Sequence, residues 1–548
     1  MIALPPRLRA AVLSAAVAAS ALLMPSARAD VKLPAVLSDS MVLQQGQPVP
    51  VWGWADKGEQ VTVTFAGQTA SAAAGDDGKW RVVLKPLTAS DQPAELTVAG
   101  KNTLKLKDVL VGEVWVCSGQ SNMEWTVKSS KNSAQEIAEA KFPNIRLFTV
   151  PKSVKKEPQS DTTGKWAACS PETVGAFSGV GYFFGRELHK DLKVPVGLIH
   201  TSWGGTPAEA WTVLDYMKKD ADLAPSVATW EQRAAAYDPA KAKEAYEKQM
   251  AAWKVSFEAA KKAGKPLPGQ PRMDQGPEKN PNGPSVLYNG MVAPIVGFAT
   301  KGTIWYQGES NAGRAYQYRK LLPMMIQSWR DAWGAAGAEK EFKFLIVQLA
   351  NFQDPAKAPG DDAWAELREA QTMTAAMPNN GMALAIDLAD ADNPRDIHPK
   401  NKQDVGRRLA LVALGKYYGK PDVKYAGPTY KAMKVEGNKV RISYTDAEGL
   451  TAKGGDGKVL GFAVAGADKA WKWADAKIEG SEVVVWSDQV SAPVAVRYAW
   501  SSNPVANLYN AAGLPAAPFR TDDWPGVTVP KPPAAPAKPA APAKPAAK

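Results

Sequence analysis

The feature that most constrains the fold is an alternation of strand-like and helix-like segments that begins at Asp108. Short apolar runs such as VGEVWVC, GLIHTSW, KGTIWYQ and FKFLIVQLA alternate with longer segments such as YQYRKLLPMMIQSWRDAW, whose apolar residues recur at helical spacing. Repeated strand–helix–strand units place strands in parallel and cover both faces of the sheet with helices. We therefore predict a three-layer α/β/α domain with a parallel sheet over residues 108–419.

Segments rich in β-structure flank this central domain on both sides. Residues 30–107 and 420–526 contain short, partly alternating apolar runs, separated by turn residues such as the Gly-Asp-Asp-Gly at 75–78. Short strands at regular spacing are typical of sandwiches and jelly rolls. We expect one β domain of this kind at each of the two ranges.

The central alternation is interrupted at residues 215–284. Within this insertion Tyr246, Met250, Trp253 and Phe257 recur at helical spacing among lysines and glutamates, and a loop rich in Pro and Gly follows. This pattern predicts an amphipathic helix that lies on the body of the protein. Its aromatic residues are expected to pack rather than to bind a ligand.

The two ends of the chain carry patterns that do not belong to a folded body. Residues 1–29 have a basic start, an apolar run and small residues before Ala29, which is the pattern of a cleavable secretory signal. A membrane anchor is the alternative, but the apolar run is short for a span, and no later segment is long enough. Residues 527–548, rich in Pro, Ala and Lys, predict an extended tail. We expect export without a membrane span, to the periplasm or, as the alternative, to the medium.

The charge argues against one class of partner. The net charge of +11 falls to about +4 when three arginines of the signal and four lysines of the tail are left out. No basic stripe with interleaved aromatic residues remains, so nucleic-acid binding is not predicted.

The cysteines and histidines bear on metals and redox chemistry. Cys117 and Cys169 leave two alternatives open, because export permits a disulfide while a buried free thiol is equally at home on an apolar strand. Three scattered histidines and two cysteines do not form a zinc-binding pattern. We therefore predict no metal and no cofactor.

Polar residues follow the predicted strands where a parallel sheet carries its sites. Ser121 follows the first strand, Gly204 and Gly205 follow GLIHTSW, and the Gly-Glu-Ser-Asn of residues 308–311 follows KGTIWYQ. A serine at such a turn can expose its hydroxyl, although a serine in a turn is usually only a helix cap. A glycine pair lets backbone N–H groups face a developing oxyanion, although it can also be a tight turn.

A serine nucleophile needs a base, and histidine is the usual one. His189 lies within a predicted helix among charged residues, and His200 lies on a predicted buried strand. His398 follows the last predicted strand, two residues after Asp396, and Pro399 also allows a plain helix start there. Considered together with the serine turn and the other strand ends, His398 is the favoured base.

The order of these blocks resembles a known family. GQSNMEW, SWGGTPAEAW, WYQGESNA and DIHPKNKQDVGRRLA are similar to the sialate O-acetylesterase family, a member of the SGNH, or GDSL-like, hydrolases. LPAVLSDSMVLQQ, LYNGMVAPI and NLYNAAGLPAAPFRTDDWP extend the resemblance over most of the chain, from Leu33 to Pro525. It implies an SGNH-hydrolase-like central domain.

The resemblance also implies roles for individual residues. Ser121 matches the nucleophile and His398 the general base, while the Ser121 backbone N–H, Gly205 and Asn311 match oxyanion donors. The wider superfamily usually has Gly-x-Asn-Asp in its third block, whereas this chain has Gly-Glu-Ser-Asn. Either Ser310 or Asn311 can therefore take the role of the asparagine.

The supporting acid departs from the superfamily pattern as well. The acid usually lies three residues before the histidine, where this chain has Arg395, and Asp396 lies two before. We favour Asp396, with Glu309 as the alternative acid and a Ser–His dyad as a third possibility. Gln120 and Gln307, which lie in the same blocks, are expected to bind substrate.

The expected reaction is serine acyl transfer that removes O-acetyl groups from sialic acids. The alternative substrate is an acetylated hemicellulose, such as xylan or xyloglucan, since related families act on these. A non-catalytic glycan-binding protein is a minor third hypothesis. The expected partner is an O-acetylated carbohydrate, and the sequence predicts no oligomeric state.

Overall fold

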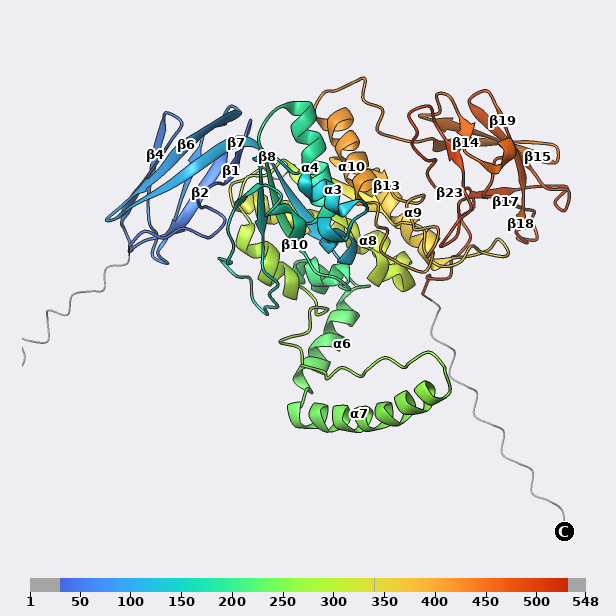
Figure 1. The fold of residues 1–548 in the computed structure, drawn as a ribbon, viewed down its shortest axis with the longest axis horizontal. Helices are drawn as coiled ribbons and strands as arrows, with labels where there is room; N and C mark the ends of the chain where they lie inside the picture. Colours follow the sequence, from blue (N-terminus) through green and yellow to red (C-terminus); the bar gives the residue numbers. More distant parts are fainter. Residues whose placement is uncertain (1–29, 340, 531–548) are drawn as a thin grey trace, which may run out of the picture.

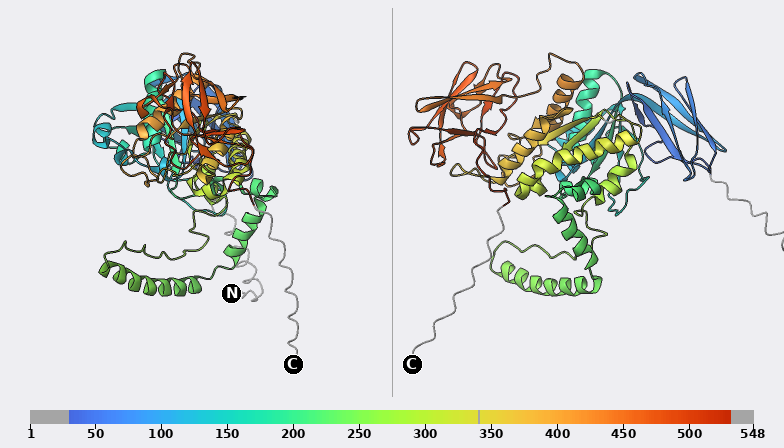
Figure 2. Two further views of the ribbon diagram at one scale, coloured as in Figure 1. Left: turned by 90° about the vertical axis from the view of Figure 1, so that its right-hand side faces the viewer. Right: turned by 180° about the vertical axis from the view of Figure 1, so that it is seen from behind.

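Three folded regions lie side by side in the computed structural model, which describes residues 30–339 and 341–530. A central α/β domain stands between an N-terminal and a C-terminal β domain, and a helical arm projects from its lower side (Figures 1 and 2). The predicted signal peptide and residues 531–548 of the predicted tail lie outside the described residues.

The central sheet has the strand order β13-β12-β11-β7-β10-β8-β9. All neighbouring strands are parallel except β8 and β9, which are antiparallel at one edge. These strands are buried almost throughout, as both faces of a parallel sheet require. Their bounds are β7 Thr103–Gly119, β8 Phe142–Thr149, β9 Ala167–Cys169, β10 Val196–Ser202, β11 Gly302–Tyr306, β12 Lys343–Gln348 and β13 Asn380–Leu384.

Helices cover both faces of this sheet, which confirms the predicted three-layer α/β/α architecture. On one face Trp115 of β7 meets Phe184 of α4, ring edge to ring face. On the other face Trp305 of β11 meets Trp329 of α8 in the same way. Helix α10 packs beside α4, and α9 packs beside α8. Their bounds are α4 Gly179–Leu192, α8 Ala315–Ala335, α9 Ala363–Ala375 and α10 Lys402–Tyr417.

Strand β7 belongs to two domains at once. Its first half pairs with β6 of the N-terminal domain, and its second half pairs with β10 and β11 of the central sheet. The boundary predicted between residues 107 and 108 therefore falls inside one continuous strand. The remaining N-terminal strands are β1 Val42–Gln44, β2 Val49–Trp54, β3 Gln60–Phe65, β4 Gln68–Ala73, β5 Lys79–Leu84 and β6 Ser90–Ala99.

The N-terminal β domain consists of the β4-β3-β6 sheet, which continues into β7, the strand β1, which also pairs with β7, and the separate β2–β5 pair. Its alternating strands bury one side and expose the other, as in β3 and β5. The buried apolar side chains of this domain join those of the central domain in a single continuous core.

The C-terminal β domain has a second hydrophobic core, to which Ile386 of the central domain also contributes. It contains two four-stranded antiparallel sheets, β14-β15-β20-β19 and β18-β17-β21-β23, and the short β16–β22 pair. Polar contacts attach it to the central domain. The buried guanidinium of Arg368 donates to backbone carbonyls of the central domain and to those of Ser501 and Ser502 in the C-terminal domain. The strands are β14 Thr429–Glu436, β15 Lys439–Thr445, β16 Thr451–Ala452, β17 Phe462–Ala465, β18 Lys472–Trp473, β19 Asp475–Glu479, β20 Glu482–Trp486, β21 Ala495–Tyr498, β22 Leu508–Tyr509 and β23 Phe519–Arg520.

The insertion differs from its prediction in one respect. Its longest helix, α7 (Pro239–Lys262), has the predicted helical span but does not lie on the body: it projects away and buries none of its residues (Figures 1 and 2). Trp253 instead packs on Phe257 and donates to the carbonyl of Pro268, so the helix meets its own return loop. The other helices of this arm are α5 Leu214–Lys219 and α6 Ala224–Ala235.

The two cysteines do not form a disulfide. Cys117 and Cys169 are both buried and free, so the disulfide alternative is wrong, and burial raises the pKa of each thiol.

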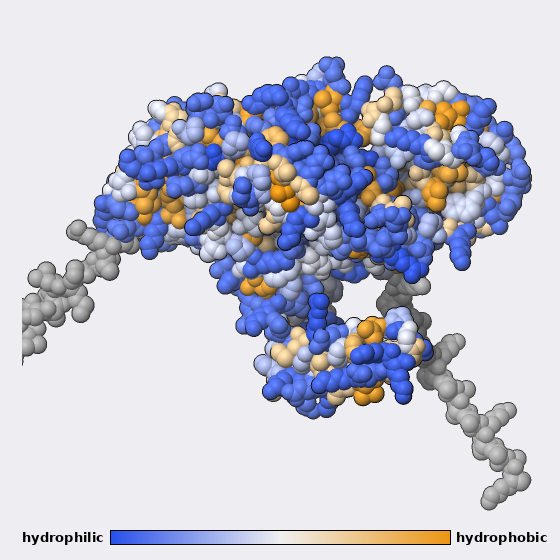
Figure 3. All heavy atoms as spheres, in the orientation of Figure 1, coloured by the Kyte–Doolittle hydropathy of each residue, from blue (hydrophilic) through white to orange (hydrophobic). Residues whose placement is uncertain are grey.

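Within the described part of the chain, no helix has the length and apolar character that crossing a membrane requires. On the face in Figure 3, apolar residues are scattered among hydrophilic ones.

Candidate active site

The serine turn lies where strand β7 gives way to the short helix α2 (Ser121–Glu124). Gly119 ends the strand with φ of 139°, and a Cβ there would lie 2.1 Å from the carbonyl oxygen of Tyr306. Only glycine lets the two strands approach so closely. The chain then turns so that Ser121 is the first residue of α2, with Gln120 preceding the helix.

Ser121 and His398 meet across this turn. The Oγ of Ser121 lies 2.9 Å from the Nε2 of His398, which is hydrogen-bonding distance. The side chain of Trp125 stacks on the imidazole, with ring centroids 4.9 Å apart and planes 14° apart. The ring of His398 is thus fixed on one face and is 25% exposed, so a ligand can still reach it.

Asp396 lies on the other side of the same imidazole. Its Oδ1 is 3.4 Å from the Nδ1 of His398 and accepts a hydrogen bond of 2.9 Å from the backbone N–H of that residue. The carboxylate therefore braces the loop and faces the ring nitrogen that does not face the serine. This contact fits the orienting role of an acid, and catalytic hydrogen bonds are often long before substrate binds.

The environment of His398 favours the neutral imidazole. Burial lowers the pKa of His398 below its usual value, and the nearby ammonium of Lys402 lowers it further, while Asp396 acts in the opposite direction. A neutral imidazole can accept the proton of a serine hydroxyl, which is what a general base must do.

The glycine pair lies directly against the serine. A Cβ on Gly204 would come 3.1 Å from the Cβ of Ser121, and the Gly204 N–H donates to Glu124. Gly205 is exposed, has φ of 75°, and its N–H donates to no group among the described residues. The backbone N–H of Ser121, at the start of α2, is likewise without an acceptor there. Both are available to a developing negative charge.

The predicted roles of Asn311 and Gln307 need correction. Asn311 is buried, donates to Glu209, and accepts from Gln307 and from the Ala208 N–H, so it braces the fold instead of facing the serine. Gln307 is fully buried, and its amide oxygen accepts from Tyr318, so it is closed to substrate. Burial keeps both amides away from a substrate at Ser121, and the position of a residue in a sequence block does not reveal its burial.

Gln120 and Ser310 differ from Gln307 and Asn311, because each keeps a polar group that a ligand can meet. The amide oxygen of Gln120 accepts from the N–H of Ser310, and its amide nitrogen donates to no group among the described residues. Ser310 is exposed, unlike its neighbour Asn311. Of the two residues that could replace the superfamily asparagine, only Ser310 therefore faces solvent.

Glu309, the alternative acid, lies in a separate network. Its carboxylate is buried, and its Oε1 accepts a hydrogen bond of 2.6 Å from the amide of Asn122, not from His398. Its Oε2 has no hydrogen-bond partner within the described part of the chain, and burial raises the pKa of this carboxyl group. The geometry favours Asp396 over Glu309 as the orienting acid.

Sequence reasoning missed three neighbours of the serine: Asn122, Trp125 and Lys402. The amide oxygen of Asn122 accepts from the ammonium of Lys402 at 2.5 Å, and that lysine is fully buried. One signal could have revealed it: Lys402 shares helical spacing with the buried residues Val405 and Leu409, so the pattern of α10 places a lysine on its apolar face.

The other two histidines have local partners. A ring nitrogen of His189 lies 2.7 Å from the carbonyl of Val194 at the end of α4. His200 is buried on β10 with its Nε2 2.6 Å from the Oγ of Ser202, and burial lowers its pKa to about 4. His398 is the histidine that the fold brings to Ser121.

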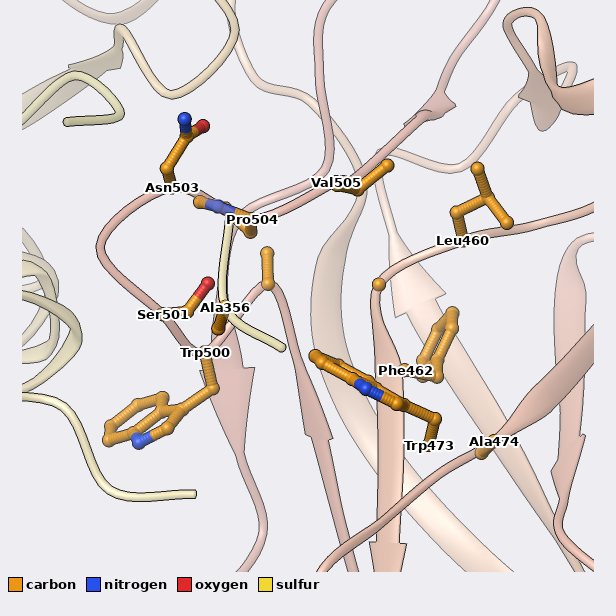
Figure 4. A pocket seen from close by; sticks show the side chains of 12 residues that line it. Ala356, Leu460, Phe462, Trp473, Ala474, Trp500, Ser501, Asn503, Pro504 and Val505 are labelled. Atoms are coloured by element: carbon orange, nitrogen blue, oxygen red, sulfur yellow. The ribbon is translucent and has the colours of Figure 1, made fainter. Parts of the chain in front are cut away.

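No group of three or more His, Cys, Asp or Glu side chains in the described ranges is arranged to hold a metal ion. A separate hollow of about 250 Å³ lies in the C-terminal domain, between Trp473, Phe462 and the loop that carries Ala356 (Figure 4). Its lining includes neither Ser121 nor His398.

Comparison with known proteins gives a consistent result. The family described as "Carbohydrate esterase, sialic acid-specific acetylesterase" matches residues 111–254 and 278–414. The sialate O-acetylesterases of Homo sapiens and Pongo abelii are each 31% identical over 537 residues, covering 89% of this chain and 93% of theirs. The crystal structure of a carbohydrate acetylesterase from Xanthomonas citri is 38% identical, with a TM-score of 0.74, covering 90% of this chain and all of that one.

Proposed function

Because the chain belongs to the sialic acid-specific acetylesterase family of carbohydrate esterases, and is therefore an esterase, we propose that it removes O-acetyl groups from sialic acids through a serine acyl-enzyme. The observation that carries the serine mechanism is the 2.9 Å contact between the Oγ of Ser121 and the Nε2 of His398. Ser121 lies just beyond the carboxyl end of β7, where such folds carry their sites, and His398 lies on the loop between β13 and α10.

In the first half of the reaction, His398 takes the hydroxyl proton of Ser121 as its oxygen attacks the acetyl carbonyl. The Ser121 and Gly205 N–H groups face the oxyanion, and loss of one such donor costs about 3 kcal/mol in transition-state stabilisation. The carbonyl re-forms, the bond to the sugar oxygen breaks, and His398 returns the proton to that oxygen.

The second half releases acetate. Water attacks the acetylated Ser121, His398 accepts the water proton, and collapse of the second oxyanion returns the proton to the serine oxygen. Asp396, beside the Nδ1 of His398, stabilises the imidazolium that forms twice in each cycle.

A second candidate substrate is an acetylated hemicellulose such as xylan or xyloglucan. The observation in its favour is that the Xanthomonas citri protein, at 38% identity, is described as a carbohydrate acetylesterase without reference to sialic acid. The same serine chemistry serves both substrates, because the ester that reacts is the same.

One experiment separates these substrates and tests the mechanism. Acetate release is measured from O-acetylated sialic acids, acetylated xylan and acetylated xyloglucan fragments, with Ser121→Ala as the paired control. Release from sialic acids that disappears in Ser121→Ala supports the proposal. Preference for a hemicellulose would replace the sugar and keep the reaction, whereas full turnover by Ser121→Ala would overturn the serine mechanism.

We also propose export to the periplasm, with the medium as the alternative, because residues 1–29 have the pattern of a cleavable signal. Fractionation of the producing cells and mass determination of the mature N-terminus test this. The expected product begins at Asp30 and is found outside the cytoplasm, and an intact Met1 in the cytoplasm would contradict it.

A further inference from the structure

Beneath the serine turn, a lysine is buried, and no carboxylate of the described residues forms an ion pair with it. Lys402 begins helix α10, is fully buried, and donates from its ammonium to the side-chain oxygen of Asn122 at 2.5 Å. Its Nζ also lies 5.8 Å from the ring centroid of Trp125 and 5.4 Å from that of Tyr306. A buried cation is costly unless the fold compensates it.

Asn122 connects this cation to the rest of the site. Its amide nitrogen donates to the Oε1 of Glu309 at 2.6 Å and to the carbonyl of Ile397 at 3.0 Å. The amide thus presents its oxygen to a cation and its nitrogen to an anion, an arrangement that fixes its orientation. Asn122 directly follows Ser121 in the chain, and its partner Ile397 directly precedes His398, so this one side chain links the two segments.

We propose that Lys402, acting through Asn122, is a positioning residue that fixes the Ser121 turn and the His398 loop relative to each other. The three buried groups, Lys402, Asn122 and Glu309, form what we call the core-side network. This inference deepens the proposed function and rests on it for its effect on rate. Lys402 itself has no contact with Ser121 or with the imidazole nitrogens among the described hydrogen bonds.

The stacking arrangement supports the same role. Trp125 lies between the two groups, since it stacks on the imidazole of His398 and also faces the ammonium of Lys402. A cation near an aromatic ring is attracted to it, so Lys402 also holds the indole against which the histidine rests. Loss of the ammonium removes a support from the turn and a support from the ring together.

Lys402 also acts on His398 through its charge. The charged groups that act on His398 are Asp396, which raises its pKa, and Lys402, which lowers it. Burial lowers the pKa of Lys402 itself to about 7, while the negative charges of Glu309 and Asp396 act in the opposite direction. Removal of the Lys402 charge should therefore raise the pKa of His398.

Lys402→Met tests this, because methionine keeps an unbranched apolar chain of similar length without the charge. The matched control is Lys400→Met, which changes an exposed lysine two residues earlier, on the loop that leads into α10. Lys402→Arg is the second variant, which keeps the charge in a bulkier head and shows whether position matters beyond charge.

The first measurement does not need the enzymatic activity. The chain has only three histidines, so its histidine ring signals can be followed individually by NMR during a pH titration. Lys402→Met should raise the pKa of His398, and Lys400→Met should leave it almost unchanged. An unchanged or lowered pKa in Lys402→Met would overturn the proposal, whatever the fate of the esterase hypothesis.

The second measurement is kinetic. Lys402→Met and Lys402→Arg should each lower kcat roughly 10- to 100-fold, with KM changed little, because the reacting groups lose alignment and not binding. Lys402→Met should also lower the Tm, since the Asn122 oxygen loses its buried donor and the Glu309 carboxylate loses a nearby cation. A lower Tm with unchanged kcat would assign Lys402 to stability alone and would refute positioning.

Discussion

Two sides of one short helix offer similar side chains in different surroundings. On the solvent side of α2, Ser121 meets His398, and the Asp396 carboxylate lies behind the imidazole. On the core side, Asn122 meets Lys402, and the Glu309 carboxylate lies behind the amide. Each side combines a small polar residue, a nitrogen base and an acid.

Access to water separates the two sides. The carboxylate of Asp396 is 27% exposed and can stabilise a charge that appears and disappears on His398. The carboxylate of Glu309 is buried, and one of its oxygens has no hydrogen-bond partner among the residues that the structure describes, so its charge state is set by the fold. In the proposed mechanism, the reacting groups therefore lie on the side that reaches solvent, and the side that does not reach it fixes their positions.

The largest expected effect falls on the solvent side. Ser121→Ala and His398→Ala should each lower kcat by about 10⁴-fold or more, and the double variant should lose no more than either one, because the two groups act as a unit. Acetate release from a good substrate measures this, with circular dichroism as the control for folding. Additive losses would mean that the two residues serve different steps.

The next effect distinguishes the two acids. Asp396→Asn should lower kcat on the order of 100-fold, because the carboxylate that orients and stabilises His398 is lost. Glu309→Gln should cost less than about tenfold, because glutamine still accepts from Asn122 and touches no reacting atom. Parallel kinetics of the two variants provide the measurement. If Glu309→Gln is the slower enzyme, the assignment of the two sides is reversed.

A smaller effect is expected at Trp125, which lies between the two sides. Trp125→Ala should lower kcat by roughly tenfold, because the imidazole loses the ring on which it stacks. Trp125→Phe keeps a ring in place and should recover most of the rate. Equal losses in the two variants would show that the indole N–H, which donates to the carbonyl of Ser129, matters more than the stacking.

The smallest expected effect is a displacement of the pH profile. The base must be neutral, so kcat/KM should fall as the pH falls through the pKa of His398, with a midpoint below 6.5 because burial lowers that pKa. In Asp396→Asn the midpoint should move to still lower pH, since Asp396 raises the pKa. A pH–rate series on both proteins checks this, and a midpoint above 6.5 in the wild type would contradict it.

The sequence predicted the layers of the central domain because their signals are local. Buried parallel strands are continuous apolar runs, and the helices between them have helical spacing. The N-terminal boundary was harder to place. In β7 the alternating half, TLKLK, belongs to a half-exposed sheet, and the apolar half, VLVGEVWVC, to a buried one. The pattern changes while the strand continues, so the change resembled a domain boundary.

At the site, the sequence singled out the residues that the fold brings together on the solvent side, Ser121, His398 and Asp396. It misjudged Asn311 and Gln307, because their polar types suit a cleft and only the fold reveals their burial. It did not find Lys402, whose partner Asn122 lies 280 residues away along the chain. Contacts of that range depend on the tertiary fold and not on any local pattern.

The shared strand β7 has a consequence for the modularity of the chain. The C-terminal β domain has its own core and begins beyond the last central helix, so its boundary falls between elements, where domains can be exchanged as units. The N-terminal β domain has no such boundary, because one strand pairs with β6 at its start and carries the serine turn at its end. Exchange of this domain would have to preserve β7, so the N-terminal domain and the serine turn are inherited together.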